Sequence, residues 1–397
     1  MISPAIADAV DRALDRAVAA GVPYVIGGVT DGAGAQHVGA AGQRSPETAD
    51  AAMPDTVIAL FSVTKAFTAT AALQCVEDGV LDLDAPARSY LPAIGDLDVL
   101  EEIAADGTVS TRPPTREITS RMLLQHTSGL GYDIFDERYA ALARRRRSHP
   151  TATPLRDSLR TPLLHDPGER WTYGTSTDWL GLLVAEVRGR RLEGVLRTGI
   201  FEPCGLESTS FDVTPSMRSR LGALHRRGRD GSIVATSSTP PDTPELDMGG
   251  QGLFSTVPDV LRFLGVWLGD GSAERGRVLR PETVAWAVRR IPGLEVTPLR
   301  SALPALACDA GFPGPATSWA HSFLFEDADV AGRRRAGTLS WAGLGNVFYW
   351  IDRTSGTAGV WAAQFMPFLD PLATSGFDAF ERAVYGASLG AGDATAG

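Results

Sequence analysis

Hydrophobic positions near the start of the chain recur every three or four residues, with Ile6, Val10 and Leu14 on one face. This spacing predicts an amphipathic helix over residues 3–20. The apolar, glycine-containing segments YVIGGVTDG and AQHVGAAGQ follow and predict two strands joined by a turn. Near the other end, GTLSWAG and VFYWIDRTSGTAGVWAAQFM predict a strand and then a hairpin, and a final helix is expected over residues 377–385.

The middle of the chain has a helical pattern. Apolar periodicity and helix stop signals predict helices near residues 62–77, 119–128, 177–188, 257–268 and 281–290. Residues 226–247 are rich in Gly, Ser, Thr and Pro, and this composition predicts a long loop.

Strands at both ends and helices between them indicate an α/β (α+β) fold. The economical arrangement is one antiparallel sheet built from both chain ends and flanked by helices, with an all-helical insertion. We expect residues 1–75 and 300–397 to form a discontinuous sheet domain and residues 76–299 a mainly helical domain. The active site is expected between them.

The composition narrows the function classes. The 397 residues include 47 acidic and 37 basic side chains, which give a formal net charge of −10. This acidic balance argues against nucleic-acid binding, which depends on cationic contacts with phosphates. No apolar run reaches the roughly 18 residues that suggest a membrane span, and the first residues lack the apolar core of a signal peptide. We therefore expect a cytoplasmic protein with neither a nucleic-acid nor a membrane partner.

Metal and cofactor motifs are missing from the sequence. Cys75, Cys204 and Cys308 are far apart and form no Cys-x-x-Cys pair, and the six histidines form no His-Glu-x-x-His motif. This pattern predicts free thiols, no metal site and no cofactor.

One basic residue stands apart from the others. Of the 37 basic residues, Lys65 is the sole lysine and all the rest are arginine. A guanidinium group stays protonated at any usable pH, whereas a desolvated ammonium group can lose its proton. Lys65 is therefore a candidate for chemistry that arginine cannot perform.

Lys65 follows Ser62 at the beginning of a predicted helix, in the pattern Ser-x-x-Lys. A spacing of three places the two side chains on one helical face. The unpaired N–H groups at a helix start suit a nucleophile whose own N–H helps to hold a developing oxyanion. The pattern alone is weak, since Ser62 also fits a helix cap.

Several longer segments resemble, in the same order along the chain, those of the serine β-lactamase and penicillin-binding-protein superfamily. The resemblance is greatest to class C β-lactamases and to the related family VIII carboxylesterases and acyltransferases. The segments are PDTVIALFSVTKAFTATAALQCVEDGVLDLDAP, LLQHTSGL, PGERWTYGTSTDWLGLLVAEVRG, GGQGLFSTVPDVLRFL and TLSWAGLGNVFYWID. This resemblance implies a β-lactamase-like fold and an acyl-enzyme mechanism.

The resemblance also implies roles for individual residues. Ser62 matches the family's nucleophile, Lys65 its partner, and Tyr173 the second-motif tyrosine that the fold brings beside the serine. The backbone N–H groups of Ser62 and Leu344 would form the oxyanion hole. A phenol and an ammonium group in contact titrate as a pair, so the sequence leaves open which of them is the base.

The chain departs from the family where substrate is bound. In place of Lys-Thr-Gly or His-Thr-Gly it has Trp341-Ala342-Gly343, which resembles the Trp-Gly-Gly of the related esterases. Thr175 replaces the Asn of the Tyr-x-Asn motif. For Asn346, the sequence fits both a contact with substrate and a structural role in a turn or at a sheet edge. We expect Trp341, Gly343, Thr175 and Asn346 to bind an ester- or thioester-like acyl donor without an obligatory carboxylate.

Two further residues are assigned structural roles. His126 would cap the carbonyl groups of a short helix rather than join a Ser-His-Asp triad. Asp178 would support the Tyr173 loop by accepting N–H bonds at a helix start.

The sequence therefore favours a serine hydrolase of esterase type, acting on small or medium esters through acyl-Ser62. The alternative is an acyltransferase that passes the acyl group to an alcohol or amine in a biosynthetic pathway. A β-lactamase or DD-peptidase is disfavoured by the altered substrate-binding motifs, and a non-catalytic scaffold by the presence of Ser62, Lys65 and Tyr173. The expected partner is a small-molecule ester or thioester, and the oligomeric state is left open.

Overall fold

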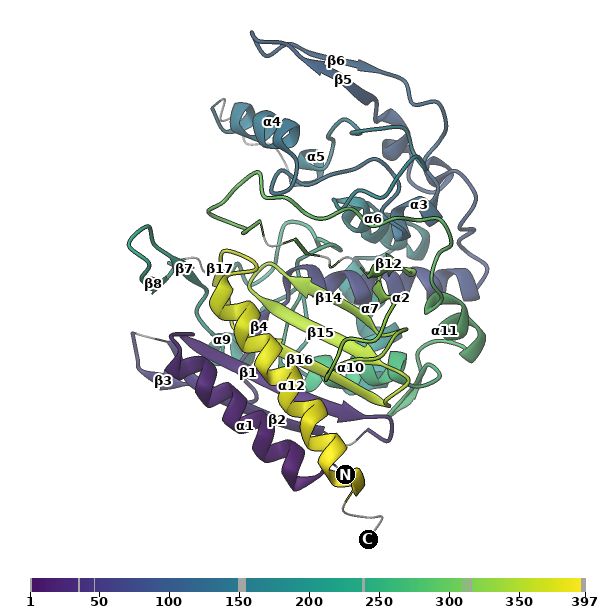
Figure 1. Cartoon of the computed structure of the whole chain (residues 1–397). Helices are drawn as coiled ribbons and strands as arrows, with labels where there is room; N and C mark the ends of the chain where they lie inside the picture. Colours follow the sequence, from purple (N-terminus) through teal and green to yellow (C-terminus); the bar gives the residue numbers. More distant parts are fainter. Residues whose placement is uncertain are drawn as a thin grey trace.

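An eight-stranded antiparallel sheet is the centre of the structure (Figure 1). The computed structural model describes residues 2–34, 36–45, 47–148, 155–237, 240–309, 311–312, 314 and 316–393. In spatial order the strands are β12 (Thr317–Trp319), β13 (Leu324–Glu326), β14 (Leu339–Gly343), β15 (Val347–Asp352), β16 (Thr357–Ala362), β1 (Tyr24–Asp31), β2 (Gln36–Ser45) and β3 (Asp50–Ala51). The pairing of β1 with β16, with Ile26 opposite Ala362, joins the two ends of the chain. The predicted sheet is thus confirmed.

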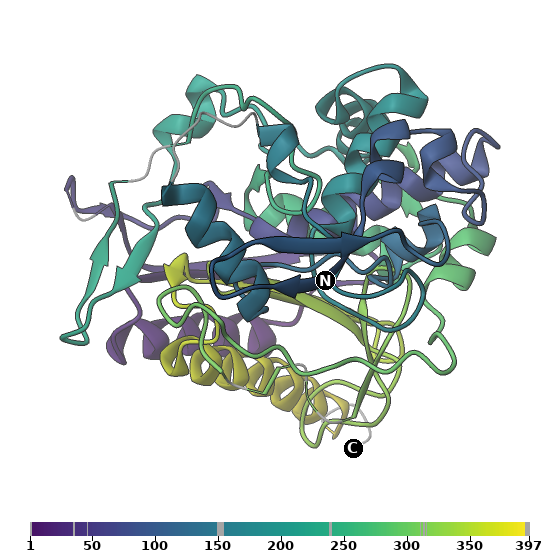
Figure 2. The ribbon, with the colours of Figure 1, turned by 90° about the horizontal axis from the view of Figure 1, so that it is seen from above.

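Helices cover both faces of this sheet. Helices α1 (Pro4–Ala19) and α12 (Pro371–Asp393) lie side by side and bury one face, where Trp350 and Trp361 contribute to the core (Figures 1 and 2). Helix α10 (Val257–Leu268) packs against β1 and β16 from the other side. Every residue of β15 is buried, which explains its apolar sequence as far as Ile351; the buried Asp352 at its end accepts from the N–H groups of Arg335 and Ser355 and from the Tyr385 hydroxyl. Among the described residues, no helix combines the length and apolarity needed to cross a bilayer.

The inserted region between β3 and β12 is mainly helical. Its other helices and 3₁₀ or π turns are η1 (Phe61–Val63), α2 (Thr64–Glu77), η2 (Ala87–Ser89), η3 (Pro92–Asp96), α3 (Ser120–Leu124), α4 (Glu137–Ser148), α5 (Leu155–Ser158), α6 (Ser176–Arg188), α7 (Leu192–Leu196), η4 (Arg197–Phe201), α8 (Glu202–Cys204), α9 (Pro215–Ser219) and α11 (Pro281–Ala287). Short strands also occur there: β4 (Ile58–Ala59) pairs with β9 (Phe254–Ser255), β5 (Val99–Ile103) with β6 (Val109–Arg112), and β10 (Ser272–Ala273) with β11 (Gly276–Arg277).

Two segments differ from the sequence-based expectation. Residues 226–247, expected as a loop, include strand β8 (Ile233–Ala235), which pairs with β7 (His225–Arg227), and β7 pairs in turn with β17 (Phe365–Met366). The last helix is longer than expected, because α12 begins at Pro371 and its small residues pack along α1.

Candidate active site

Ser62 and Lys65 lie where η1 passes into α2, in the interior of the molecule. Helix α2 is rich in Ala and Thr on all sides and is buried along most of its length, as expected for a central helix without a polar face. This packing leaves the Lys65 side chain only 2% exposed. The spacing of three does place both side chains together, since Lys65 Nζ lies 3.1 Å from Ser62 Oγ.

The backbone before Ser62 is held in an unusual conformation. Phe61 has a φ of 47°, in the left-handed region that bulky residues rarely adopt. Such a conformation costs on the order of 1–3 kcal/mol and persists only where the surroundings impose it. Here the Gln364 side chain bonds both backbone groups of Ala59, at 3.0 and 2.9 Å. The chain therefore enters the helix at a fixed angle, with Ser62 at the turn.

Lys65 has three polar contacts. In addition to Ser62 Oγ, its Nζ donates to the Tyr132 hydroxyl at 3.1 Å and to the Gly250 carbonyl at 2.7 Å. An ammonium group has three N–H donors, so all of them find an acceptor. Burying a charged group without such partners would be costly.

Tyr132 was not identified from the sequence. It follows the LLQHTSGL segment in a loop, and no spacing rule connects it to Lys65, so only the fold brings it there. Its hydroxyl donates to Asp178 Oδ2 at 3.1 Å. Burial raises the pKa of Tyr132 well above its usual value, and the charge of Asp178 adds to this effect. Tyr132 is thus a protonated phenol that links Lys65 to a carboxylate.

Asp178 accepts backbone N–H bonds. Its Oδ1 accepts from the N–H of Gly250 at 2.9 Å, and its own N–H in the first turn of α6 also interacts with the carboxyl group. Burial raises the pKa of Asp178, while Lys65 and the two hydrogen bonds act in the opposite direction. Besides the expected N–H interaction at the helix start, Asp178 therefore contacts Gly250 and Tyr132.

Tyr173 lies on the other side of Lys65. The Lys65 Nζ is 4.9 Å from the centroid of the Tyr173 ring, a cation–π distance. The Tyr173 hydroxyl accepts a hydrogen bond from Trp341 Nε1 at 3.1 Å. A phenol that accepts one bond still has its own proton to donate.

The end of β14 approaches the residues just before Ser62. At Gly343 a Cβ atom would lie 2.3 Å from the carbonyl oxygen of Leu60 and 3.3 Å from Phe61 Cβ, so only glycine fits there. Leu344 follows directly in the chain. The fold thus brings the two segments that carry the candidate oxyanion donors, Ser62 and Leu344, into contact.

Trp341 belongs to an aromatic wall beside Tyr173. Its ring packs edge-to-face on those of Tyr173, Trp171 and Trp319, with centroid separations of 4.9, 6.4 and 5.0 Å. The Thr175 hydroxyl at the start of α6 is buried and has no hydrogen-bond partner in the protein. Both residues lie close in sequence or space to Tyr173, so they remain candidates for substrate contact.

Asn346 is better explained as a turn residue. Its φ is 57°, its side chain is fully buried, and its Nδ2 donates to the carbonyls of Phe365 and Pro367 at 2.7 and 2.9 Å. Its Oδ1 accepts from the Leu369 N–H at 2.8 Å. Because these bonds occupy the amide, we withdraw Asn346 from the substrate-binding residues.

His126 also differs from the expectation. Its backbone, with a φ of 56°, follows α3, but its imidazole Nε2 lies 3.4 Å from Thr177 Oγ1 instead of capping the helix. Burial lowers the pKa of His126 well below its usual value, and Lys65 adds to this effect. A neutral imidazole packed against Tyr173 and Trp171 is a structural element. Within the described residues, no group of His, Cys, Asp and Glu is arranged to hold a metal ion.

Known proteins resemble this chain over most of its length. The Beta-lactamase family model matches residues 10–376. The monacolin J acid methylbutanoyltransferase of Aspergillus terreus is 31% identical over 347 residues, covering 83% of this chain and 82% of that protein. The lovastatin esterase of Penicillium rubens is 32% identical over 342 residues, covering 81% and 82% of the two chains. The structure of unliganded simvastatin synthase (LovD) from Aspergillus terreus has a TM-score of 0.79 at 27% identity, covering 96% and 98%. The predicted β-lactamase-like fold is confirmed.

Proposed function

Because this chain belongs to the β-lactamase family, we propose that it is an acyl-transfer enzyme that works through an ester intermediate on Ser62. The observation that carries this proposal is the 3.1 Å contact between Ser62 Oγ and a buried lysine at a helix start. An amine in that position can accept the serine proton, and the adjacent N–H groups can stabilise an oxyanion. Relatives named as an acyltransferase and as an esterase support the same chemistry.

In the first half-reaction, Ser62 Oγ attacks the carbonyl carbon of an ester or thioester and its proton passes to Lys65. The N–H groups of Ser62 and Leu344 bind the oxyanion of the tetrahedral intermediate. The carbon–oxygen or carbon–sulfur bond then breaks, and Tyr173 gives its proton to the leaving group. The proton that Lys65 has taken from Ser62 then replaces the one that Tyr173 has given to the leaving group, so the proton balance is closed. The second half-reaction reverses these steps with an alcohol as the attacking group.

The substrate-binding wall favours donors without a carboxylate. Trp341 takes the place of a cationic residue, and an indole cannot neutralise an anion. It does offer a flat apolar surface to an acyl chain or an aryl ester. We assign Trp341, Gly343 and Thr175 to the acyl-donor site.

The acyl-enzyme can be detected directly. The protein is incubated with a panel of p-nitrophenyl esters, acyl thioesters and benzylpenicillin, and the peptide that contains Ser62 is measured by mass spectrometry. We expect the acyl mass of at least one ester or thioester on Ser62, and little or no penicilloyl adduct. Adducts located on other residues, or none with any donor, would contradict the proposal.

Hydrolysis is the second candidate, and the likeness to the lovastatin esterase favours it. The two reactions differ only in whether water or an alcohol attacks acyl-Ser62. They are separated by adding alcohols of increasing size during turnover of one donor. An increase in the new ester at the expense of free acid indicates a transferase, whereas unchanged release of acid indicates a hydrolase.

Replacing Tyr173 by phenylalanine is expected to lower turnover by roughly 10²- to 10⁴-fold, because the leaving group loses its proton donor. The loss of one hydroxyl should leave the fold intact. The matched control is Tyr24→Phe, which removes a buried hydroxyl bonded to the Ala223 carbonyl at 3.0 Å, away from Ser62. Near-normal turnover and an unchanged pH–rate profile in the Tyr173 variant would exclude this role.

A further inference from the structure

The polar contacts around Lys65 form a closed ring. Lys65 Nζ donates to the Tyr132 hydroxyl, which donates to Asp178. Asp178 accepts from the N–H of Gly250, and the carbonyl of the same Gly250 accepts from Lys65. Lys65 and Asp178 are 2% and 1% exposed, so water competes little for these bonds. The ring is therefore a stable environment for one amine.

Gly250 closes the ring because it has no side chain. A Cβ atom at this position would lie 2.4 Å from Asp178 Oδ2, so any other residue would displace the carboxylate. The neighbouring Gly249 is also held, since its carbonyl accepts from Thr68 Oγ1 at 2.7 Å. The segment is thus attached to α2 on one side and to α6 on the other.

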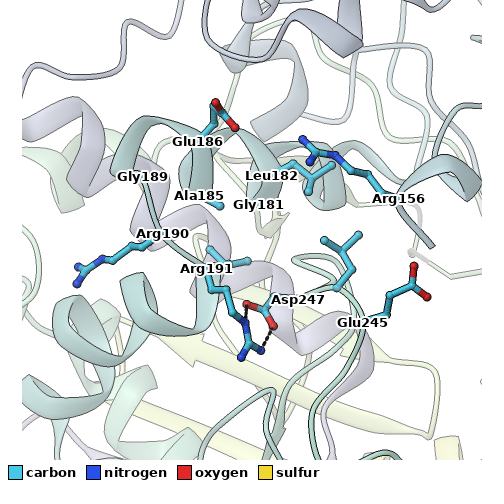
Figure 3. Close-up of a pocket in the computed structure, with 12 residues that line it drawn as sticks. Arg156, Gly181, Leu182, Ala185, Glu186, Gly189, Arg190, Arg191, Glu245 and Asp247 are labelled. Atoms are coloured by element: carbon cyan, nitrogen blue, oxygen red, sulfur yellow. Dashed lines mark hydrogen bonds and ion pairs between the residues drawn. The ribbon is translucent and has the colours of Figure 1, made fainter. Parts of the chain in front are cut away.

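The same segment is anchored again a few residues earlier. Asp247 pairs with Arg191 through two bonds of 2.6 and 3.2 Å, at a cavity of about 340 Å³ beside α6 (Figure 3). Asp247 also accepts the N–H of Glu193 at 3.0 Å. These contacts fix the chain that leads to Gly250, so the ring does not depend on a free loop.

Opposing effects act on the pKa of Asp178, and burial, the largest of them, raises it. Burial opposes ionisation of the carboxyl group, but Lys65 and two hydrogen-bond donors favour it. The other ionisable groups that act on the pair are Tyr132, Tyr173, His126 and, through Tyr132, Asp133. Of these, His126 is neutral because its burial lowers its pKa, and Tyr132 stays protonated. Asp178 is therefore the group in the ring that can balance a positive charge on Lys65, to which it is linked through Tyr132 and Gly250.

We propose that Tyr132 and Asp178 are positioning residues that aim the Lys65 amine at Ser62 and set the pH at which it becomes able to accept the serine proton. This inference rests on the proposed function. In the proposed reaction, the Ser62 proton passes to the Lys65 amine, and the buried carboxyl group of Asp178 balances the positive charge that Lys65 then carries. Tyr132 contacts Lys65 directly and Asp178 is linked to it through Tyr132 and Gly250, so we assign both a role that acts through Lys65.

The pH dependence of kcat/KM for a neutral ester tests this role. In Asp178→Asn the ammonium group loses its compensating charge, so Lys65 should deprotonate at lower pH. The acidic limb of the profile should therefore move down by about one pH unit, and the plateau should fall by up to about tenfold because the amine is a weaker base. Tyr132→Phe removes one acceptor of the ammonium group and should shift the limb in the same direction.

Asp259→Asn is the matched control. Asp259 is also buried near a helix start and accepts from the Ser208 N–H and Thr209 Oγ1 at 2.8 and 3.0 Å, but it lies outside the ring. The acidic limb of the kcat/KM profile of Asp259→Asn should stay at the wild-type position. If Asp178→Asn does not fold, the position of the acidic limb in Tyr132→Phe, which loses only one hydroxyl, tests the positioning role by itself.

Ser62→Ala in the same assay distinguishes a failure of the proposed function from a failure of the positioning role. If this variant keeps wild-type turnover, the proposed function is wrong and the limb does not report on Lys65. If it is inactive while Asp178→Asn and Tyr132→Phe keep the wild-type limb, or shift it to higher pH, the positioning role is wrong and the proposed function stands.

Discussion

Replacing Ser62 by alanine is expected to lower turnover of the best ester or thioester donor by about 10⁴- to 10⁶-fold. Ser62 supplies the oxygen that forms the covalent bond, and removal of a nucleophile that acts as a unit with its base disables the whole assembly. Steady-state turnover and the mass of the Ser62 peptide measure this effect. The acyl adduct should vanish together with the activity.

A second buried serine provides the control for this variant. Ser120 on α3 is fully buried, and its Oγ has no hydrogen-bond partner. Ser120→Ala therefore removes the same atom without breaking a bond, and it should keep wild-type turnover. A Ser62→Ala protein with more than about a hundredth of the wild-type rate would show that another group is the nucleophile.

Lys65→Arg is expected to be nearly as damaging, although it keeps the positive charge. A guanidinium group stays protonated at any usable pH, so it cannot accept the proton of Ser62. It is also planar and larger than an ammonium group, and the three acceptors of the site, on Ser62, Tyr132 and Gly250, are placed for the three donors of an ammonium group. Turnover across a range of pH values measures the loss, which alkaline pH should not rescue.

Circular dichroism and thermal unfolding must first show that the Lys65→Arg protein is folded. Retention of more than about a tenth of wild-type turnover by the folded variant would contradict a proton-transfer role for this lysine. In that case a positive charge near Ser62 would be sufficient, and the base would have to be sought elsewhere.

The sequence predicted those parts of the site that depend on local geometry. A spacing of three on a helix brings Ser62 and Lys65 together in any fold, and the structure shows them 3.1 Å apart. Tyr132 and Gly250 reach Lys65 from separate segments, 67 and 185 residues away along the chain. Helical or strand periodicity contains no information about such contacts, and this is why both residues were missed.

The same limit explains the errors elsewhere. Asn346 was assigned from its position after the Trp341 motif, but its role depends on the carbonyls of Phe365, in β17, and of Pro367, directly after that strand. Strands β1, β2, β14, β15 and β16 of the main sheet were predicted from their apolar segments, whereas the short strands β3, β12 and β13 were not. Strands β7 and β8 have only three residues each, and β7 carries the polar side chains His-Arg-Arg, so neither strand is long enough to show an alternating pattern.

The seam between β1 and β16 has a consequence for synthesis of the protein. Strand β1 is made near the beginning of translation, whereas its partner is made near the end. Until then β1 has β2 on one side and an unpaired edge on the other, and such edges promote aggregation. The strand that reaches Ser62, β14, is also synthesised late. A nascent chain that stops before β14 therefore exposes an unpaired β-edge and has no assembled catalytic centre.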